Sequence, residues 1–329
     1  MTCSRKRFRN WKGYMQDNVK SKAVIFKTPS SFNERTMRDF LSSVEPVFRM
    51  KGKDVENVTF DVSYTTSANI LGMLMIYKFL DYTVKNKCFM KPLFNAGDFT
   101  KRLIDSSGFT KWVQSYVKSY VNDINKPADY GELRYQVSND LFIAPIALNR
   151  QSEDIATSSV NNSICQYYGY NPSIRFAILT CIGEVISNFA AHADNETKTV
   201  LVASGNKNHF ELACADNGIG IVSSLNDIIN RELPRKENYE VLERSLDKGI
   251  TSKLDASSGH MGCGLWILNQ YITATKGEMH IFSEGAYIHN HQGRMRRGKC
   301  GYWKGTIIYL TLPLSAPARI AETTNKLNQ

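Results

Sequence analysis

Apolar and polar positions alternate along the chain in a way that predicts strands and helices in turn. Short apolar runs rich in β-branched and aromatic residues favour strands, whereas apolar positions three and four residues apart favour helices. We expect strands at 23–28, 58–62, 88–94, 141–148, 210–215 and 307–312, and helices at 33–48, 69–86, 98–106, 152–167, 265–273 and from 172 onward. Strands that alternate with helices imply an α/β protein, with helices packed on a mixed or parallel sheet.

The helix that begins near Pro172 carries polar residues on one face. Asn171 and Pro172 suit the N-cap and first-turn positions, and good helix formers follow them. Farther along, Glu184, Asn188 and His192 recur at intervals of four residues, so their side chains share one face of a helix that is otherwise largely apolar. A polar stripe on an apolar helix indicates a function for these side chains.

A second set of candidate residues follows the predicted strand 210–215. Asp216 comes directly after that strand, and Gly218 and Gly220 follow it at alternate positions. A carboxylate at a strand end accepts hydrogen bonds, and glycines let the backbone approach a ligand closely. This combination is suited to binding a purine base.

Two further glycine motifs lie nearer the C-terminus. The run Gly-Cys-Gly-Leu at 262–265 opens a predicted helix, whose free N–H groups and positive end suit a phosphate group. Gly305 and Thr306 precede the predicted strand 307–312. Each motif is weak when taken singly, so the order in which they occur together carries the information.

Together these motifs resemble those of the GHKL ATPase superfamily, which has the Bergerat fold. The motifs of that superfamily are matched by Glu184 and Asn188, by Asp216, Gly218 and Gly220, by Gly262 and Gly264, and by Gly305 and Thr306. The pattern Glu-x3-Asn-x3-His most resembles the helix motif of the anti-sigma-factor serine kinases. The resemblance implies a C-terminal ATPase domain of the α+β sandwich type, with helices on one face of a mixed sheet.

The resemblance also implies roles for individual residues. Glu184 would be the catalytic base, Asn188 would hold Mg²⁺, and Asp216 would accept a hydrogen bond from the exocyclic amine of ATP. The polar segment 222–259 resembles a lid that closes over the phosphates, and His192 would contact phosphate or, the interpretation we favour, pack against that lid. The implied contacts to ATP are Asn188, Asp216, Gly218, Gly220, Lys248, Thr251, Gly262, Cys263, Gly264, Leu265 and Thr306, with Ser252 and His260 as further candidates.

Residues 58–112 resemble a STAS domain, the α/β fold of anti-sigma-factor antagonists. Those antagonists carry an Asp-Ser-Ser-Gly run in which a partner kinase phosphorylates a serine, whereas the corresponding run here is Asn-Ile-Leu-Gly at 69–72. Since apolar residues replace both serines, phosphotransfer to that position is excluded, and Thr66 and Ser67 lie one helical turn away. We therefore expect a docking or scaffold domain.

Composition indicates a globular chain from a reducing compartment. Apolar residues make up 42% of the 329 positions, which is enough for two domains with substantial cores. The 7 cysteines are scattered without a Cys-x-x-Cys pair, which predicts buried, reduced thiols rather than disulfides or a metal site. The most apolar run, 70–80, is short and contains Lys78, and no signal-peptide pattern follows Met1. We expect a soluble cytoplasmic protein.

The net charge of +10 is concentrated in two stretches. A solvated basic arm and a solvated basic loop are the simplest interpretation, and contact with nucleic acid or an acidic protein surface is the alternative. The basic positions are Arg5, Lys6, Arg7, Arg9, Lys12, Lys20, Lys22 and Lys27 in the arm, and Arg294, Arg296, Arg297, Lys299 and Lys304 in the loop.

These patterns predict five segments and leave three functions open. We expect a basic arm at 1–22, a STAS-like domain at 23–115, a linker at 116–135, an ATPase domain at 136–315 and a loose polar tail at 316–329. The favoured function is a Mg²⁺-dependent ATP-binding regulator whose slow hydrolysis drives lid closure or homodimer formation and whose STAS-like domain contacts protein partners. The alternatives are a protein serine/threonine kinase of the anti-sigma type and a nucleic-acid-associated module switched by ATP.

Overall fold

The computed structural model describes residues 23–49, 57–62, 64–87, 90–93, 141–148, 153–192, 199–232, 236–251 and 262–327. Helices and strands both contribute to it, which confirms the expected α/β class. Each strand and helix predicted within these ranges is present, with ends that differ by a few residues. The predicted helix 98–106, the arm 1–22 and the linker 116–135 lie outside the described residues.

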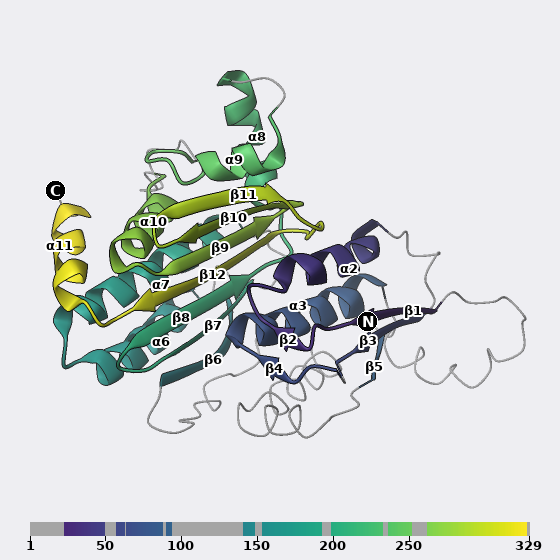
Figure 1. Cartoon of the computed structure of the whole chain (residues 1–329), viewed down its shortest axis with the longest axis horizontal. Helices are drawn as coiled ribbons and strands as arrows, with labels where there is room; N and C mark the ends of the chain where they lie inside the picture. Colours follow the sequence, from purple (N-terminus) through teal and green to yellow (C-terminus); the bar gives the residue numbers. More distant parts are fainter. Residues whose placement is uncertain are drawn as a thin grey trace, which may run out of the picture.

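A seven-stranded sheet forms the centre of the fold, with the strand order β11-β10-β9-β12-β8-β7-β6 (Figure 1). All of its neighbouring strands pair in the antiparallel sense, so the expectation of a mixed sheet is wrong here. The strands are β6 (Leu141–Leu148), β7 (Thr199–Gly205), β8 (His209–Ala215), β9 (Glu278–Ser283), β10 (Ala286–His291), β11 (Arg294–Lys299) and β12 (Thr306–Pro313).

Tight turns explain part of this antiparallel pairing. Glu284 and Gly285 join β9 to β10, and Gln292 and Gly293 join β10 to β11, all with positive φ. Two-residue turns with positive φ at both positions match the twist of antiparallel strands, whereas a parallel pair would need a long crossover. These hairpins are hard to recognise in the sequence, because neither turn contains the stronger signal Asn-Gly or Asp-Gly.

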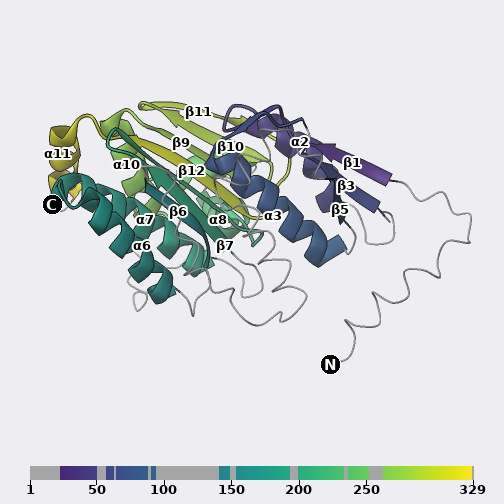
Figure 2. The same cartoon turned by 90° about the horizontal axis from the view of Figure 1, so that it is seen from below.

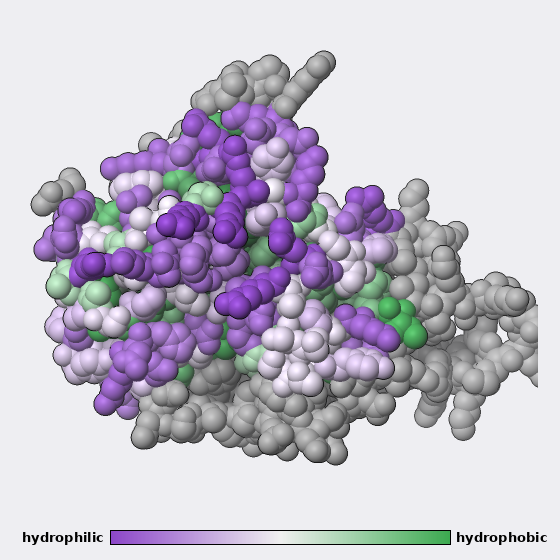
Figure 3. All heavy atoms as spheres, viewed as in Figure 1, coloured by the Kyte–Doolittle hydropathy of each residue, from purple (hydrophilic) through white to green (hydrophobic). Residues whose placement is uncertain are grey.

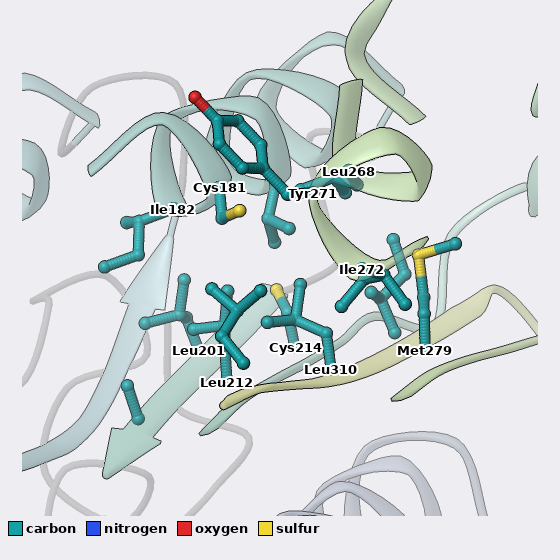
Figure 4. Packing of buried hydrophobic residues seen from close by; sticks show 14 of the residues in the cluster. Cys181, Ile182, Leu201, Leu212, Cys214, Leu268, Tyr271, Ile272, Met279 and Leu310 are labelled. Carbon is teal, nitrogen blue, oxygen red and sulfur yellow. The ribbon is translucent and has the colours of Figure 1, made fainter. Parts of the chain in front are cut away.

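One face of this sheet is covered by α6 (Glu153–Tyr168), α7 (Pro172–His192) and α10 (Gly264–Thr275) (Figure 1). The layer between them is apolar. Figure 4 shows Cys181 and Tyr271 from the helices on one side and Cys214 and Leu310 from the strands on the other. This core fixes where α7 and α10 lie on the sheet, and therefore where their polar residues are presented.

The opposite face of the same sheet is covered by α2 (Met37–Arg49) and α3 (Ile70–Lys87) (Figure 2). Their apolar side chains share one buried cluster with Val200, Ala213 and Ile307 of the strands. The central strands are therefore buried on both faces, which agrees with their nearly continuous apolar sequences. The helices of the predicted ATPase domain lie on one face of the sheet, as expected, and the N-terminal part of the chain supplies a second helical layer on the other face.

A small parallel sheet lies beyond α2 and α3 (Figure 2). It consists of β1 (Ala23–Lys27), β3 (Asn57–Asp61) and β5 (Met90–Leu93), in the order β1-β3-β5. The short strands β2 (Ser31–Phe32) and β4 (Ser67–Ala68) form a separate parallel pair. Parallel pairing is what strands that alternate with helices predict, so this expectation is confirmed for the N-terminal part.

The segment predicted to be a lid, 222–259, contains regular structure. It includes most of α8 (Ile221–Glu232) and all of α9 (Asn238–Arg244). Apolar side chains of both helices, Leu225 and Leu242 among them, are buried in the main core. A lid function of this segment stays a prediction, and residues 252–261 lie outside the described ones.

The C-terminal residues do not form the loose tail that we expected. Most of them belong to α11 (Pro317–Leu327), which packs on α7 and α10. Its Ile320 is buried, and the Thr324 hydroxyl lies 2.9 Å from the hydroxyl of Tyr271. Apolar residues at helical spacing within a polar sequence explain the difference.

The predicted basic loop at 294–304 is largely the edge strand β11, on a face that Figure 3 shows to be mostly hydrophilic. Arg297 pairs with Glu243 of α9, and Lys299 Nζ lies 2.8 Å from Glu237. Charged side chains on an edge strand discourage pairing with other chains. Part of this cluster therefore has a structural partner, and binding of nucleic acid stays a prediction.

Two expectations drawn from composition can be compared with the structure. Cys181 and Cys214 are buried, as predicted, whereas Cys165 is exposed and Cys263 and Cys300 are half-buried. Among the described residues, no helix is both long and apolar enough to cross a membrane.

Gly301 marks a very close approach between α2 and the segment that leads into β12. A Cβ atom at this position would overlap backbone atoms of Leu41 and Ser42. We expect Gly301→Ala to lower the free energy of unfolding by about 1–3 kcal/mol, as overpacking typically does, when measured by urea denaturation. Gly183→Ala is the matched control, since nothing lies within 4 Å of its Cβ position. Unchanged stability of Gly301→Ala would contradict this docking of α2.

Candidate functional site

The polar stripe predicted on α7 meets the start of α10. The N–H of Ile174 donates to Asn171 Oδ1 at 3.1 Å, which confirms the predicted N-cap of α7. At the other end of α7, a Cβ atom on Gly264 would lie 2.6 Å from Glu184 Oε2 and 2.8 Å from Asn188 Nδ2. Only glycine fits here without displacing both polar side chains. Residues separated by about eighty positions are thus brought together.

The N-terminus of α10 faces these side chains. Cys263 is the N-cap residue of α10, and in the described part of the chain its side chain makes no capping hydrogen bond to the helix. Asn188 Nδ2 is buried and has no hydrogen-bond partner there. The N–H groups at the start of a helix attract anions, and a buried amide without a partner costs free energy unless a ligand satisfies it. The start of α10 and Asn188 together therefore have the character of an anion-binding site.

A second group of predicted residues surrounds Asp216 at the end of β8. Its Oδ1 accepts hydrogen bonds from the N–H of Gly218 at 2.5 Å and the N–H of Thr306 at 3.3 Å. A Cβ atom on Gly305, whose φ is +100°, would overlap Asp216 Oδ1 and lie 2.8 Å from the nitrogen of Gly218. The indole N–H of Trp303 donates to the carbonyl oxygen of Asp216 at 2.9 Å. The carboxylate is therefore held in one orientation.

Burial gives Asp216 unusual electrostatics. The residue is 5% exposed, and desolvation raises the pKa of its carboxyl to about 6 from the ordinary value of 3.8. The N–H of Gly218, the ammonium of Lys78 and the N–H of Thr306 oppose this shift in pKa. Lys78 belongs to α3, so a charge from the N-terminal part acts on this site from the other side of the sheet. A buried carboxylate that costs free energy at neutral pH indicates a function.

Gly220 turns the chain from the site into α8. Its φ is +92°, and a Cβ atom there would lie against the carboxylate of Glu284. Glu284 Oε2 accepts a hydrogen bond from the N–H of Ser223 at 2.7 Å, and the N–H of Ile221 donates to Ser283 Oγ at 3.0 Å. The N-terminus of α8 is thus already capped by protein groups, in contrast to that of α10.

The remaining predicted contacts lie near the C-terminal end of the segment 222–259 and at Gly262, which follows it. Lys248 Nζ lies 4.9 Å from the ring centre of Trp266, and the N–H of Gly249 donates to the carbonyl oxygen of Gly262 at 3.1 Å. Gly262 has φ of +66°, which favours glycine. These contacts place Lys248 beside the first turn of α10.

Three predicted residues cannot be compared with the structure. Two others, Leu265 and Thr251, lie in surroundings that give no sign of a ligand-binding role for their side chains. Ser252, His260 and the side chain of His192 lie outside the described part of the chain. Leu265 packs against the main hydrophobic core, and Thr251 is half-buried. The backbone N–H of Leu265 lies in the first turn of α10 and can still bind a phosphate group, whereas its side chain packs against the core.

The structure therefore gathers the predicted residues into two groups. Glu184, Asn188 and Gly264 meet where α7 faces α10, and Asp216 meets Thr306 at the ends of β8 and β12. Both groups border the same hydrophobic core, to which α7 contributes Cys181 and β8 contributes Cys214 (Figure 4). One group offers hydrogen-bond donors to an anion, and the other offers a fixed acceptor.

Sequence reasoning missed the residues that support Asp216 from outside its own motif. Trp303 is fully buried, Lys78 is fully buried beside Asp81, and Glu284 sits in a hairpin turn. A lysine inside the most apolar run of the chain was a usable signal, because a buried lysine needs a charge partner. The roles of Trp303 and Glu284 depend on contacts between distant segments and have no local sequence signal.

No protein-family model matches the chain, and a search of curated proteins found no relative with significant sequence similarity.

The raised pKa of Asp216 predicts that the carboxylate lowers stability at neutral pH. The folded state binds this proton more tightly than the unfolded chain, so the favourable contribution is present at low pH and is lost as pH rises toward about 6. Asp216→Asn keeps the acceptor Oδ1 and removes the charge. We expect its free energy of unfolding to exceed that of the wild type by at most about 3 kcal/mol above pH 6, shrinking toward pH 4.

Urea denaturation of both proteins across this pH range checks the prediction. Asp39→Asn, a change at an exposed position of α2, is the control and should shift stability by less than about 1 kcal/mol at every pH. An Asp216→Asn protein less stable than wild type at neutral pH would contradict the assignment of a costly buried charge.

Proposed function

We propose that this protein is a regulator that binds ATP with Mg²⁺ and hydrolyses it slowly. The observation that carries the proposal is the meeting of Gly264 with Glu184 and Asn188 at the N-terminus of α10, where the amide of Asn188 is buried without a partner among the described residues. The second group, around Asp216, supplies an acceptor suited to a nucleobase. Both features agree with the resemblance to GHKL ATPases.

The base of the nucleotide would be selected at Asp216. Its Oδ1 is engaged by the N–H groups of Gly218 and Thr306, which leaves Oδ2 as the natural acceptor for the exocyclic amine of adenine. Guanine presents a carbonyl oxygen at the same place, and two acceptors facing each other in a buried site repel. The site should therefore prefer ATP to GTP.

The phosphates would bind at the start of α10. The N–H groups of its first turn and the dipole of the helix favour negative charge, and Gly264 keeps this approach free of a side chain. Asn188 fits a Mg²⁺ ion, because a half-turn of its carboxamide would present an oxygen in place of the unpartnered Nδ2. When bound, the ion would neutralise charge on the phosphate oxygens.

Glu184 is the candidate general base. It lies one helical turn before Asn188 on the same face of α7, and its Oε2 faces Gly264. A carboxylate in this place can orient a water molecule or a hydroxyl group and accept its proton as the bond to phosphorus forms. The molecule that receives the γ-phosphoryl group distinguishes the two activities. In an ATPase it is water, and in a serine/threonine kinase it is a protein hydroxyl.

The N-terminal part is suited to respond to the state of this site. Trp303 donates to the carbonyl of Asp216, and its ring centre lies 5.2 Å from that of Phe48 on α2. Gly301, two residues earlier, lies against the backbone of α2. A change at Asp216 would therefore reach α2 through one short segment, which supports a regulatory role for the N-terminal part.

The environment of residues 69–72 supports docking rather than phosphorylation. Ile70 and Leu71 are buried, and Asn69 donates to Glu34 at 2.9 Å and to the Tyr309 hydroxyl of the central sheet at 3.2 Å. The position that a STAS antagonist would phosphorylate is thus covered in this chain. A kinase activity would have to act on a separate protein.

Replacing Glu184 separates binding from hydrolysis. Glu184→Gln keeps the size of the side chain and one acceptor oxygen but removes the base, so we expect ATP affinity to stay within about threefold while hydrolysis falls at least about 100-fold. Incubation with γ-labelled ATP measures both, with label followed as free phosphate and on protein. Unchanged hydrolysis would contradict the role of Glu184. Label on an added protein partner would favour the kinase alternative.

Gly264→Ala tests the close contact of Gly264 with Glu184 and Asn188 directly. The added Cβ would push Glu184 and Asn188 aside, so we expect ATP affinity to fall at least about tenfold while the protein remains folded. Equilibrium dialysis with labelled ATP measures the affinity. Gly183→Ala is the matched control on α7, because its Cβ position is open. Equal ATP affinity of the two variants would contradict phosphate binding at this place.

A further inference from the structure

Three of the six histidines of the chain gather around one carboxylate on the central sheet. Glu278 and His280 lie on β9, and His289 and His291 lie on β10. The antiparallel register places His289 opposite His280 and His291 opposite Glu278. Because side chains alternate along a strand, all four point to the same face of the sheet. This is the face on which α2 and α3 pack, since Phe282 and Tyr287 belong to the same cluster as those helices.

The ring nitrogens converge on the carboxylate of Glu278. His291 Nδ1 lies 2.6 Å from Oε1, His280 Nε2 lies 3.5 Å from Oε2, and His289 Nε2 lies 3.7 Å from Oε2. The rings of His280 and His289 stack with their centres 3.9 Å apart. One carboxylate therefore faces several imidazole nitrogens at close range.

Hydrogen bonding to Glu278 accounts for part of this arrangement but leaves one imidazole nitrogen without a partner. Nε2 of His289 is buried and, within the described part of the chain, has no hydrogen-bond partner. A buried imidazole nitrogen without a partner costs free energy, and such atoms call for a ligand. Such a nitrogen beside a carboxylate and a second imidazole indicates a missing positive centre.

We propose that Glu278, His289 and His291 form a binding site for a transition-metal ion of the zinc class. One ligand atom from each of these side chains lies within 4.8 Å of the others. Zinc bonds of about 2.1 Å in a tetrahedral arrangement place ligand atoms about 3.4 Å apart, so small changes in side-chain torsion are enough to close the site. Two imidazoles and one carboxylate form a common set of zinc ligands.

His280 has a different part in this site. It is the most buried of the three histidines, with a side chain 7% exposed, against 22% for His289 and 44% for His291. Its nitrogen faces Glu278 Oε2, so it would hold the carboxylate in place as an outer partner of the metal ligands. The exposure of His291 leaves a path for the ion and room for water as a further ligand.

The site is separate from the proposed nucleotide site. Glu278 begins β9, and the opposite end of β9 leads to Ser283 and Glu284 beside Gly220. The ligand set also contains no residue from the four GHKL-like motifs. Metal binding and ATP binding can therefore succeed or fail independently.

The test is a titration of the full chain, freed of metal by a chelator, with Zn²⁺ and with Co²⁺. We expect one Zn²⁺ per chain and a rise in melting temperature on binding. Co²⁺ should give the intense visible bands of a tetrahedral site, without the additional band that a cysteine thiolate ligand would cause. A silent Co²⁺ titration with no stoichiometric Zn²⁺ uptake would overturn the proposal.

Single substitutions test which side chains bind the metal ion. Glu278→Gln and His289→Gln should each weaken Zn²⁺ affinity at least about tenfold, and His280→Gln should have a smaller effect with the Co²⁺ bands shifted but retained. His209→Gln is the matched control, since His209 is exposed at the start of β8, near the same end of the sheet. Affinity that is unchanged in Glu278→Gln and His289→Gln, or lost equally in His209→Gln, would refute this site.

Discussion

A carboxylate buried at the end of a sheet strand is the constraint on which the rest of the candidate site depends. Asp216 cannot be solvated by water at this place, so the fold has to supply N–H donors from Gly218 and Thr306 and a positive charge from Lys78. Those groups come from three segments of the chain, which must all be in position before the charge is tolerated. Even so, desolvation prevails, and the pKa of Asp216 remains raised. Retaining so costly a group is understandable if a ligand donates the missing hydrogen bond, as adenine would in the proposed function.

The same constraint links the two parts of the chain. The central sheet is buried on both faces, and α2 and α3 pack on the face that includes Ala215, the residue before Asp216. Trp303 lies at the junction, with its indole N–H on the Asp216 carbonyl and its ring against Phe48. A ligand that rearranged this junction would alter the packing of α2, and a partner that displaced α2 would alter the site. Such reciprocity is what a regulatory nucleotide switch requires.

Local patterns in the sequence were enough to predict most elements but not their assembly. The caps and apolar spacing around Asn171 and Pro172 predicted α7 correctly, and the sequence order of the glycine motifs suggested which distant residues belong together. The antiparallel order of the sheet, the second helical layer and the helices within the expected lid were missed, because each depends on contacts between distant segments. The histidine cluster was missed for the same reason. Glu-x-His and His-x-His are uninformative alone, and only the register of β9 with β10 brings them together.

The central claim is that this chain binds ATP, with Asp216 reading the base and Asn188 holding the metal ion on the phosphates. The most direct test is a calorimetric titration of the full chain at neutral pH with ATP and with GTP, each with Mg²⁺ present and then absent. The account predicts saturable binding of one ATP per chain that weakens without Mg²⁺, and an affinity for GTP at least about 100-fold lower, as expected of a site built around a specific hydrogen bond. No uptake of ATP in the presence of Mg²⁺, or equal affinity for the two nucleotides, would contradict it.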